Sequence, residues 1–436
     1  MPHHIRPVIS AIAVAAGTLA ATAVAWPAAA EPATTVAYPA WASATRYTGP
    51  AFDTCAAPPL STMRAWLASP YRAIGLYVGG QNRTCLQPEL TSSWVRGVAD
   101  LGWRMIPIFK GRQAPCSVDE SDLKILPSAA TAEGTWAADN AAEQVRALGM
   151  FRGGAIYYDM EAYDTANRAC ASTVLTFLSA WTRELHRLGY VAGVYANLNL
   201  GASDLADTYL STSYARPDAL WIARYDGNES LTGWAGIGDS LWAVHQRAKQ
   251  YRADFSATYG DVKLTIDADN WDATVATTAF TYRATALVRA RTAPSPSYPL
   301  VKVYEQGASL PVVCQTPGSL VGTTRVWDKL NTGAYVTDNY VSTPSGTDFS
   351  PPITRCLYPY QITASGGVNE RSGPGVTYPI NGVLPAGALT WLVCQDPGST
   401  VGSTPVWDKI DYRHWVSDYW VATPSKTTYS KPAPRC

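Results

Sequence analysis

Two acidic side chains stand two positions apart where the apolar run "GGAIYYDMEAYD" (residues 153–164) reaches its polar end. In an extended strand, residues two apart point to the same face, so Asp159 and Glu161 share a face with Tyr157 beneath them. Two carboxyl groups can cleave one glycosidic bond when one donates a proton and the other stays charged. The alternative is structural, with both acids capping loops or accepting hydrogen bonds from backbone amides.

The elements that would position this pair alternate between strands and helices. Over residues 45–277, short apolar runs recur between helical patterns, several of which end at a glycine just before the next run. We count eight strand-like runs, the seventh over residues 240–247 and the eighth over 262–269. This order predicts an α/β fold, a (β/α)8 barrel of the TIM type, whose working face lies at the carboxyl ends of the strands.

Further polar and aromatic residues end the other predicted strands and would share that rim. They are Asp53 after the first, Arg224 and Tyr225 after the sixth, His245 and Gln246 after the seventh, and Asp267 and Asp269 after the eighth. Because the first and eighth strands close the barrel, acidic groups from three strands are expected to converge there. We therefore expect these residues, together with Tyr157, to bind substrate around the central acidic pair.

Eight cysteines and the amino-terminal segment indicate export. Residues 1–30 have the pattern of a signal peptide, an Ala/Val-rich run followed by small residues. Cys55, Cys85, Cys116 and Cys170 would follow the first four strands; of their three possible pairings, adjacency favours Cys55–Cys85 and Cys116–Cys170. No C-x-x-C spacing occurs and histidines are few, which argues against a metal site.

The last third of the chain is an internal repeat. The segment "VCQTPGSLVGTTRVWDKL" recurs as "VCQDPGSTVGSTPVWDKI", which divides this part into modules over residues 278–356 and 357–436. Short alternating runs broken by Gly and Pro predict that each module is small and all-β. One disulfide within each copy is the economical pairing: Cys314–Cys356 and Cys394–Cys436.

The second copy, which opens with "VNERSGPGVTYP", resembles bacterial SH3 domains. Members of that family usually bind cell-wall peptides on an aromatic-lined groove. The first copy has "VRARTAPSPSYP" at the same place, with Ala293 and Ser295 replacing Gly373 and Gly375. This difference favours the second copy as the binding module. The alternative for both copies is a passive spacer.

The strand ends together resemble the lysozymes of glycoside hydrolase family 25, and more closely the secreted bacterial glycoside-hydrolase-like domains related to them. The motifs are "FDTC", "YYDMEAY", "LWIARYDG", "LWAVHQ" and "TIDAD". The resemblance implies that Glu161 is the general acid and that Asp159 stabilises charge or orients the substrate, with Asp53 and Asp267 on their flanks. His245 departs from the family pattern, in which a tryptophan precedes the glutamine. The resemblance also implies a sugar cleft lined by three aromatic residues: Trp221, Tyr225 and Trp242.

The formal net charge is zero, from 34 basic and 34 acidic residues, which argues against a nucleic-acid or lipid-binding surface. The sequence predicts a secreted, wall-associated monomer that hydrolyses cell-wall glycan, a muramidase-like glycoside hydrolase without a cofactor. Its partners would be the glycan and its peptide stems, with no nucleic acid and no membrane after signal cleavage. The alternative is a catalytically inactive protein with the same barrel that binds wall glycan.

Overall fold

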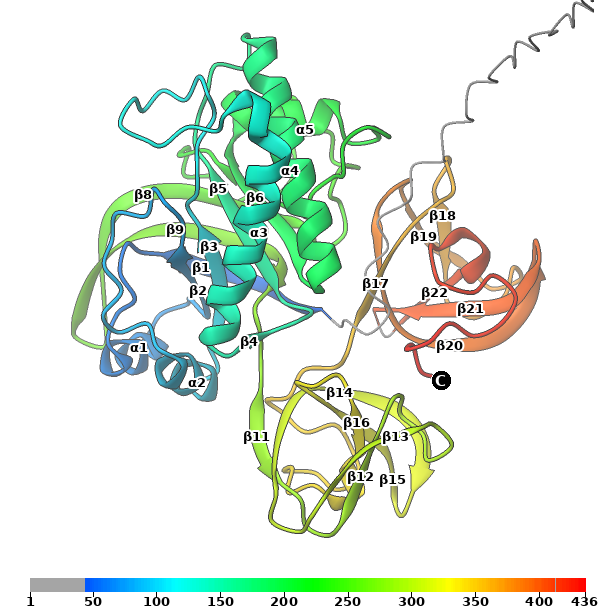
Figure 1. The fold of residues 1–436 in the computed structure, drawn as a ribbon. Helices are drawn as coiled ribbons and strands as arrows, with labels where there is room; N and C mark the ends of the chain where they lie inside the picture. Colours follow the sequence, from blue (N-terminus) through cyan, green and yellow to red (C-terminus); the bar gives the residue numbers. More distant parts are fainter. Residues whose placement is uncertain (1–43, 412) are drawn as a thin grey trace, which may run out of the picture. The chain divides into compact units, whose positions relative to one another are not determined.

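Eight strands close into a barrel in the part of the chain that the structure describes, a computed structural model covering residues 44–411 and 413–436 (Figure 1). The expected signal peptide lies outside these residues. In order around the barrel the strands are β1 (Thr45–Asp53), β2 (Ala73–Gly79), β3 (Arg104–Phe109), β5 (Ala155–Met160), β6 (Val191–Asn197), β7 (Ala219–Ala223), β8 (Arg247–Tyr259) and β9 (Val262–Val275). None of the described helices is both long and apolar enough to span a membrane.

Helices connect the strands from β1 to β7. They are α1 (Leu60–Ala65), α2 (Ser92–Asp100), α3 (Ala130–Ala147), α4 (Arg168–Leu188) and α5 (Ser203–Asp207), with short turns η1 (Trp66–Ala68), η2 (Pro127–Ala129) and η3 (Leu198–Ala202). The two longest, α3 and α4, lie side by side outside the barrel (Figure 1). α4 is capped by the Asn167 side chain, which accepts from the N–H of Cys170, and it ends at Gly189 with φ of 87°, as both residue types favour.

The last two barrel strands depart from the expected (β/α)8 pattern. Neighbouring strands from β1 to β8 are parallel, whereas β9 runs antiparallel to both β8 and β1. A two-residue turn joins β8 to β9, with positive φ at Gly260 (52°) and Asp261 (63°). A parallel neighbour would need a long crossover, which this turn cannot supply. The barrel is therefore mixed and carries few helices.

The predicted seventh strand over residues 240–247 is wrong. The chain makes turns as far as Gln246, and β8 begins at Arg247. β8 then runs parallel to β7, with Gln250 opposite Ala223. The residues that face the barrel mouth from this strand are therefore those near Gln250, several positions later than expected.

Aromatic rings fill the barrel interior below the mouth. Tyr157, Trp221 and Trp271 are each no more than 1% exposed and pack edge-to-face, with ring centroids 5.1–6.1 Å apart. The Tyr157 hydroxyl donates to the Thr274 carbonyl at 2.8 Å. Gly193 on β6 lies opposite Tyr157 and leaves room for its ring. The interior is thus a packed core, as in other eight-stranded barrels.

A short two-stranded sheet follows the barrel, and two β-rich modules make up the rest of the chain. β4 (Met150–Phe151) pairs with β10 (Thr277–Thr278). The first module contains β11 (Phe280–Arg283), β12 (Val288–Arg291), β13 (Leu300–Tyr304), β14 (Ser309–Val321), β15 (Thr324–Leu330), β16 (Tyr335–Thr337) and η4 (Asp338–Tyr340). The second contains β17 (Tyr358–Gln361), β18 (Val368–Arg371), β19 (Ile380–Leu384), β20 (Leu389–Val401), β21 (Thr404–Ile410), β22 (His414–Ser417) and η5 (Asp418–Trp420). Both form six-stranded sheets with the same strand order, so the sequence repeat is also a structural repeat.

A buried glutamine joins two aspartates in each module. Gln315 Nε2 donates to Asp328 Oδ1 at 2.8 Å and to Asp338 Oδ1 at 3.1 Å. The Oδ2 atoms of both aspartates are buried and receive no N–H or O–H donor. Burial and the neighbouring Asp338 carboxylate raise the pKa of Asp328 well above its usual range, and burial also raises the pKa of Asp338. The second module repeats this arrangement with Gln395, Asp408 and Asp418.

Candidate active site

Carboxyl groups from three strands gather at the barrel mouth. Asp53 ends β1 and lies in register with Asp267 on β9, while Asp159 lies near the end of β5 and Glu161 follows that strand. Tyr77 on β2 lies among them. Burial and then the charges of all four carboxylates raise its pKa. The structure therefore brings the two expected carboxylate pairs to one site.

A lysine binds both members of the central pair. Lys110 Nζ, just after β3, lies 2.7 Å from Glu161 Oε1 and 3.7 Å from Asp159 Oδ2. Asp159 is buried, whereas the Glu161 side chain is 36% exposed. Burial and the Glu161 charge raise the pKa of Asp159 well above its usual range, although Lys110 opposes this shift. The pair therefore combines a buried carboxyl group whose surroundings favour the protonated form with an ion pair on its exposed side.

A buried glutamine fixes the backbone of this pair. Gln113 Nε2 donates to the Asp159 carbonyl at 2.8 Å, and its Oε1 accepts from the Glu161 N–H at 2.8 Å. Gln113 is fully buried, so these bonds are shielded from water. The chain consequently leaves β5 in one defined direction, with Glu161 at the edge of the mouth.

A second glutamine links the opposite pair of acids. Gln250 Nε2 donates to Asp53 Oδ2 at 2.7 Å and lies 3.4 Å from Asp267 Oδ2. Its Oε1 accepts from the hydroxyls of Tyr195 (2.8 Å) and Tyr225 (3.0 Å), which orients the amide group. Burial and the Asp267 charge raise the pKa of Asp53 to about 8. Because Asp53 interacts with both Asp267 and Asp269, the acids on this side of the mouth share protons near neutral pH.

The direction of β9 decides which of its aspartates reaches the mouth. Asp267 is half-buried beside Asp53, and burial raises its pKa. Asp269 pairs with Ala51, two residues deeper along β1, and is completely buried. On a parallel strand Asp269 would have stood above Asp267, so its expected place at the rim is wrong. It lies below the site instead.

A cavity of about 340 Å³ opens beside these acids. It lies next to the disulfide between Cys55 and Cys85, which follow β1 and β2. Its charged and aromatic lining comprises Asp53, Tyr77, Arg83, Lys110, Asp254 and Asp267. The lining mixes both signs of charge, which suits a polar, uncharged or weakly charged ligand such as a sugar.

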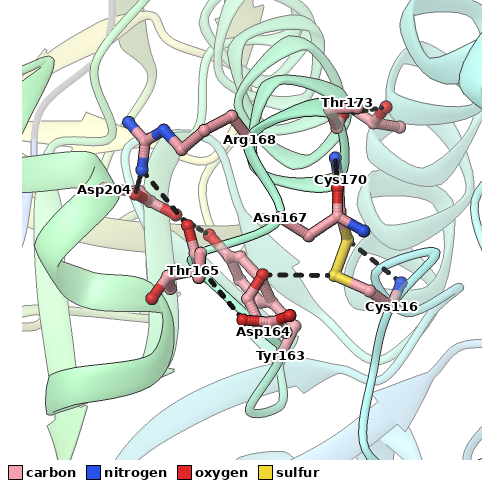
Figure 2. The surroundings of a disulfide bond; sticks show 11 residues. Cys116, Tyr163, Asp164, Thr165, Asn167, Arg168, Cys170, Thr173 and Asp204 are labelled. Carbon is pink, nitrogen blue, oxygen red and sulfur yellow. Dashed lines mark hydrogen bonds and ion pairs between the residues drawn. A yellow bond between two sulfur atoms is a disulfide. The ribbon is translucent and has the colours of Figure 1, made fainter.

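A second disulfide braces the loops near the central pair. Cys116 is bonded to Cys170, at the start of α4, and the Cys116 N–H also donates to the Cys170 sulfur. Figure 2 shows Tyr163 in the same group, with its hydroxyl donating to Asp204 Oδ2 at 2.9 Å. Arg168 pairs with the other oxygen of Asp204 at 3.1 Å. The segment that carries Glu161 is thereby tied to α4 and α5. Together with the two bonds in the modules, all four expected disulfides are confirmed.

Several residues expected at the rim lie elsewhere. His245 and Gln246 precede β8, so they lie at the end of the barrel opposite the mouth; His245 Nδ1 lies 2.6 Å from Asp272 Oδ1. Trp242 is buried against Tyr209, with ring centroids 4.8 Å apart. The buried rings of Tyr157 and Trp221 cannot line an open cleft.

Two of the expected residues beyond β7 are accessible. Tyr225 is 58% exposed and bonded to Gln250, so it can meet a ligand at the mouth. Arg224 is directed to Asp226, with Nε 2.8 Å from its carboxylate.

No three His, Cys, Asp or Glu side chains in residues 44–411 and 413–436 are placed to share a metal ion.

Sequence reasoning missed Lys110, Gln113, Gln250 and Tyr77. Lys110 had a readable signal, because it ends the apolar run "GWRMIPIFKG" at the expected rim. Gln250 would have followed from the correct register of the seventh strand. Gln113 and Tyr77 carry no local signal, since their roles depend on contacts with β5 and with four carboxylates from different strands.

The barrel and its mouth define a glycoside-hydrolase-like architecture, with paired carboxyl groups at one end of a closed sheet. The sequence profile of the family described as "Rv2525c-like, glycoside hydrolase-like domain" matches residues 64–271. Residues 64–271 of this chain are therefore similar to this glycoside-hydrolase-like family.

Individual relatives are more distant. The uncharacterized protein YraJ of Bacillus subtilis is 38% identical over 90 residues, which cover 18% of this chain and 76% of YraJ. The Tat-secreted protein Rv2525c of Mycobacterium tuberculosis, solved with L-tartrate, is 14% identical with a TM-score of 0.35, covering 52% of this chain and 96% of that one. A family 25 glycosyl hydrolase from Bacillus anthracis is also 14% identical, with a TM-score of 0.33 over 52% of this chain and 89% of that one.

Proposed function

We propose that this protein is a secreted glycoside hydrolase that cleaves cell-wall glycan at the barrel mouth. The observation that carries the proposal is the Asp159–Glu161 pair, one buried and one exposed, facing Asp53 and Asp267 across the mouth. Two such carboxyl groups supply a proton for the leaving oxygen and a charge for the oxocarbenium-like centre. The match of residues 64–271 to a glycoside-hydrolase-like family supports the reaction class, and four disulfides support an oxidising compartment.

Glu161 is the residue placed to deliver the proton, because its side chain reaches solvent at the edge of the mouth. In this proposal its reservoir is Asp159, which interacts with Glu161 and whose raised pKa favours the protonated form. A proton that passes from Asp159 to Glu161 leaves a buried carboxylate next to the Lys110 ammonium group, which stabilises that charge. Asp53 and Asp267 would bind the sugar from the opposite side.

The Lys110–Glu161 ion pair also favours a second candidate function. A glutamate side chain whose oxygen is held 2.7 Å from the Lys110 ammonium group is engaged in that ion pair and is not free to donate a proton to a glycosidic oxygen. If substrate does not separate the two, the mouth binds glycan without cutting it. The two functions share one site, and they differ only in whether substrate binding separates Glu161 from Lys110.

The C-terminal modules would retain the enzyme on the wall. A groove of about 480 Å³ in the second module is lined by apolar side chains that include Val376, Val383 and Trp420. All three are well exposed despite being apolar, which is typical of a binding surface. We also propose that the modules are SH3-like, that they span residues 278–356 and 357–436, and that the protein is a monomer.

The release of new reducing ends from purified peptidoglycan tests the catalytic proposal. Glu161→Gln is expected to lower the initial rate by about a hundredfold or more, since it removes a general acid. The matched control is Glu143→Gln, an exposed glutamate on α3 away from the mouth, which should keep the full rate. Retention of the protein on the wall without any new reducing ends from the unaltered chain would establish the binding function instead.

A further inference from the structure

Asp269 is a fully buried acid directly below the mouth. Its Oδ1 accepts from the indole N–H of Trp221 at 3.0 Å. Its Oδ2 is buried and receives no N–H or O–H donor from the described residues. Asp53 and Asp269 are diagonal neighbours on the same face of the β1–β9 pair, and their carboxyl groups interact. Two ionised carboxylates are acceptors only, so a bond between them requires that one of them holds a proton.

The hydrogen-bond donors around the two groups decide where this proton lies. Asp53 also accepts from Gln250 Nε2 at 2.7 Å, and the two tyrosine hydroxyls on Gln250 Oε1 prevent that amide from turning over. Asp53 is therefore offered two donors, Gln250 and its partner acid, whereas Asp269 is offered only Trp221. More donors stabilise a carboxylate, so the charge belongs on Asp53 and the proton on Asp269.

We propose that Asp269 is a positioning residue that stays protonated at neutral pH and donates its proton in a hydrogen bond to Asp53, which fixes the Asp53 carboxylate at the mouth. The inference rests on the proposed function, in which Asp53 binds the sugar. Asp269 itself touches no substrate, because it lies two residues below Asp53 in the strand register.

The electrostatic surroundings agree with this assignment. Burial and then the Asp53 charge raise the pKa of Asp269 well above its usual range, and Asp267 on the same strand adds to the shift. Tyr71, before β2, is the other titratable group that senses the charge of Asp269. The remaining partner, Trp221, does not titrate. No cation among the described interactions of Asp269 favours its ionised form.

Asparagine is the natural mimic of a protonated aspartic acid at this position. In Asp269→Asn the side-chain carbonyl can accept from Trp221 while the amide group donates to Asp53, so both bonds are kept without a titratable proton. Asp269→Leu has a similar volume but offers neither bond, and it leaves the Trp221 N–H and the Asp53 carboxylate without their partner.

The test combines infrared spectroscopy with glycan assays on the full mature chain. The difference spectrum between the unaltered protein and Asp269→Asn at pH 7 should contain the C=O stretch of one protonated carboxyl group, lost in the variant. Asp269→Asn should retain peptidoglycan binding and reducing-end release, whereas Asp269→Leu should lose about tenfold or more, the usual effect of a missing buried donor.

Absence of the protonated-carboxyl band, or an Asp269→Asn variant as impaired as Asp269→Leu, would overturn the proposal. If Asp269→Leu does not fold, as judged by circular dichroism, the infrared band and the Asp269→Asn activities still decide. If the unaltered chain neither binds nor cleaves peptidoglycan, the proposed function fails, while the infrared band continues to report the proton on Asp269 independently.

Discussion

Lys110 is the cation that lies against both carboxyl groups of the Asp159–Glu161 pair. Its ammonium group contacts both carboxylates, and although burial lowers its pKa, the two acids more than reverse that effect and keep it protonated. The same interaction acts on Asp159 in the opposite direction, because a nearby positive charge favours the ionised carboxylate. Lys110 therefore limits how high the pKa of the Asp159–Glu161 pair can rise.

Replacing Lys110 with methionine should shift the pH dependence of glycan hydrolysis. Without the positive charge the pair holds its proton more tightly, so its pKa rises and the alkaline limb of the rate profile moves to higher pH. Lys110→Arg, which keeps the charge, is the control and should leave that limb in place. The measurement is the initial rate of reducing-end release across pH; an alkaline limb that stays fixed in Lys110→Met would show that the pair does not supply the proton.

At the scale of elements, the barrel could be predicted as far as β7 and not beyond. The alternation of apolar runs and helical patterns locates β1, β2, β3, β5, β6 and β7, because α2, α3 and α4 are long enough to show their period. After β7 no helix separates the strands, so that signal disappears. A different signal was present: "SATYGDVKLT" places a Gly-Asp pair between alternating runs, which is typical of a tight hairpin.

Recognising this hairpin in the sequence would also have corrected the predicted site residues. An antiparallel β9 places Asp267 at the mouth and Asp269 below it, and the β8 register places Gln250 rather than Gln246 beside Asp53.

The positions of the aromatic residues could not be predicted in this way. Trp221 and Trp242 are of the residue type that often stacks on sugars. In the structure, however, both are core residues, because Trp221 packs against Trp271 inside the barrel and Trp242 packs against Tyr209. Burial of that kind depends on tertiary contacts that a single sequence does not reveal.

The pairing of β5 with β6 requires a glycine on β6 opposite Tyr157 of β5. A Cβ at Gly193 would lie 2.3 Å from the Tyr157 ring, which is held by Trp221, Trp271 and a hydroxyl bond. Gly193→Ala should therefore lower the free energy of unfolding by about 1–3 kcal/mol through overpacking. Gly238→Ala is a matched control, since a Cβ there meets nothing closer than 3.8 Å. Equal thermal unfolding midpoints for the two variants would show that the Tyr157 ring can move.

At the scale of the whole molecule, the two modules share a fold but not a binding surface. Their strand orders and their buried glutamine–aspartate networks are the same. The groove of the second module, however, is bordered by Gly366 and Gly367, where the first module has Ala286 and Leu287. The Leu287 side chain is 44% exposed at that position. Repetition has thus preserved the core, while the rim of the groove differs between the copies.

This difference predicts unequal contributions of the modules to wall retention. Trp420 lines the groove of the second module and is 39% exposed, and its counterpart in the first module is Tyr340, 37% exposed. Trp420→Ala removes a large apolar surface from the groove, so we expect the fraction of protein that sediments with purified cell walls to fall severalfold. Tyr340→Ala is the matched control, with the same kind of truncation at the equivalent place, and should sediment like the unaltered chain. An equal loss in both variants would mean that the modules bind alike despite their different rims, and no loss in either would favour the spacer interpretation.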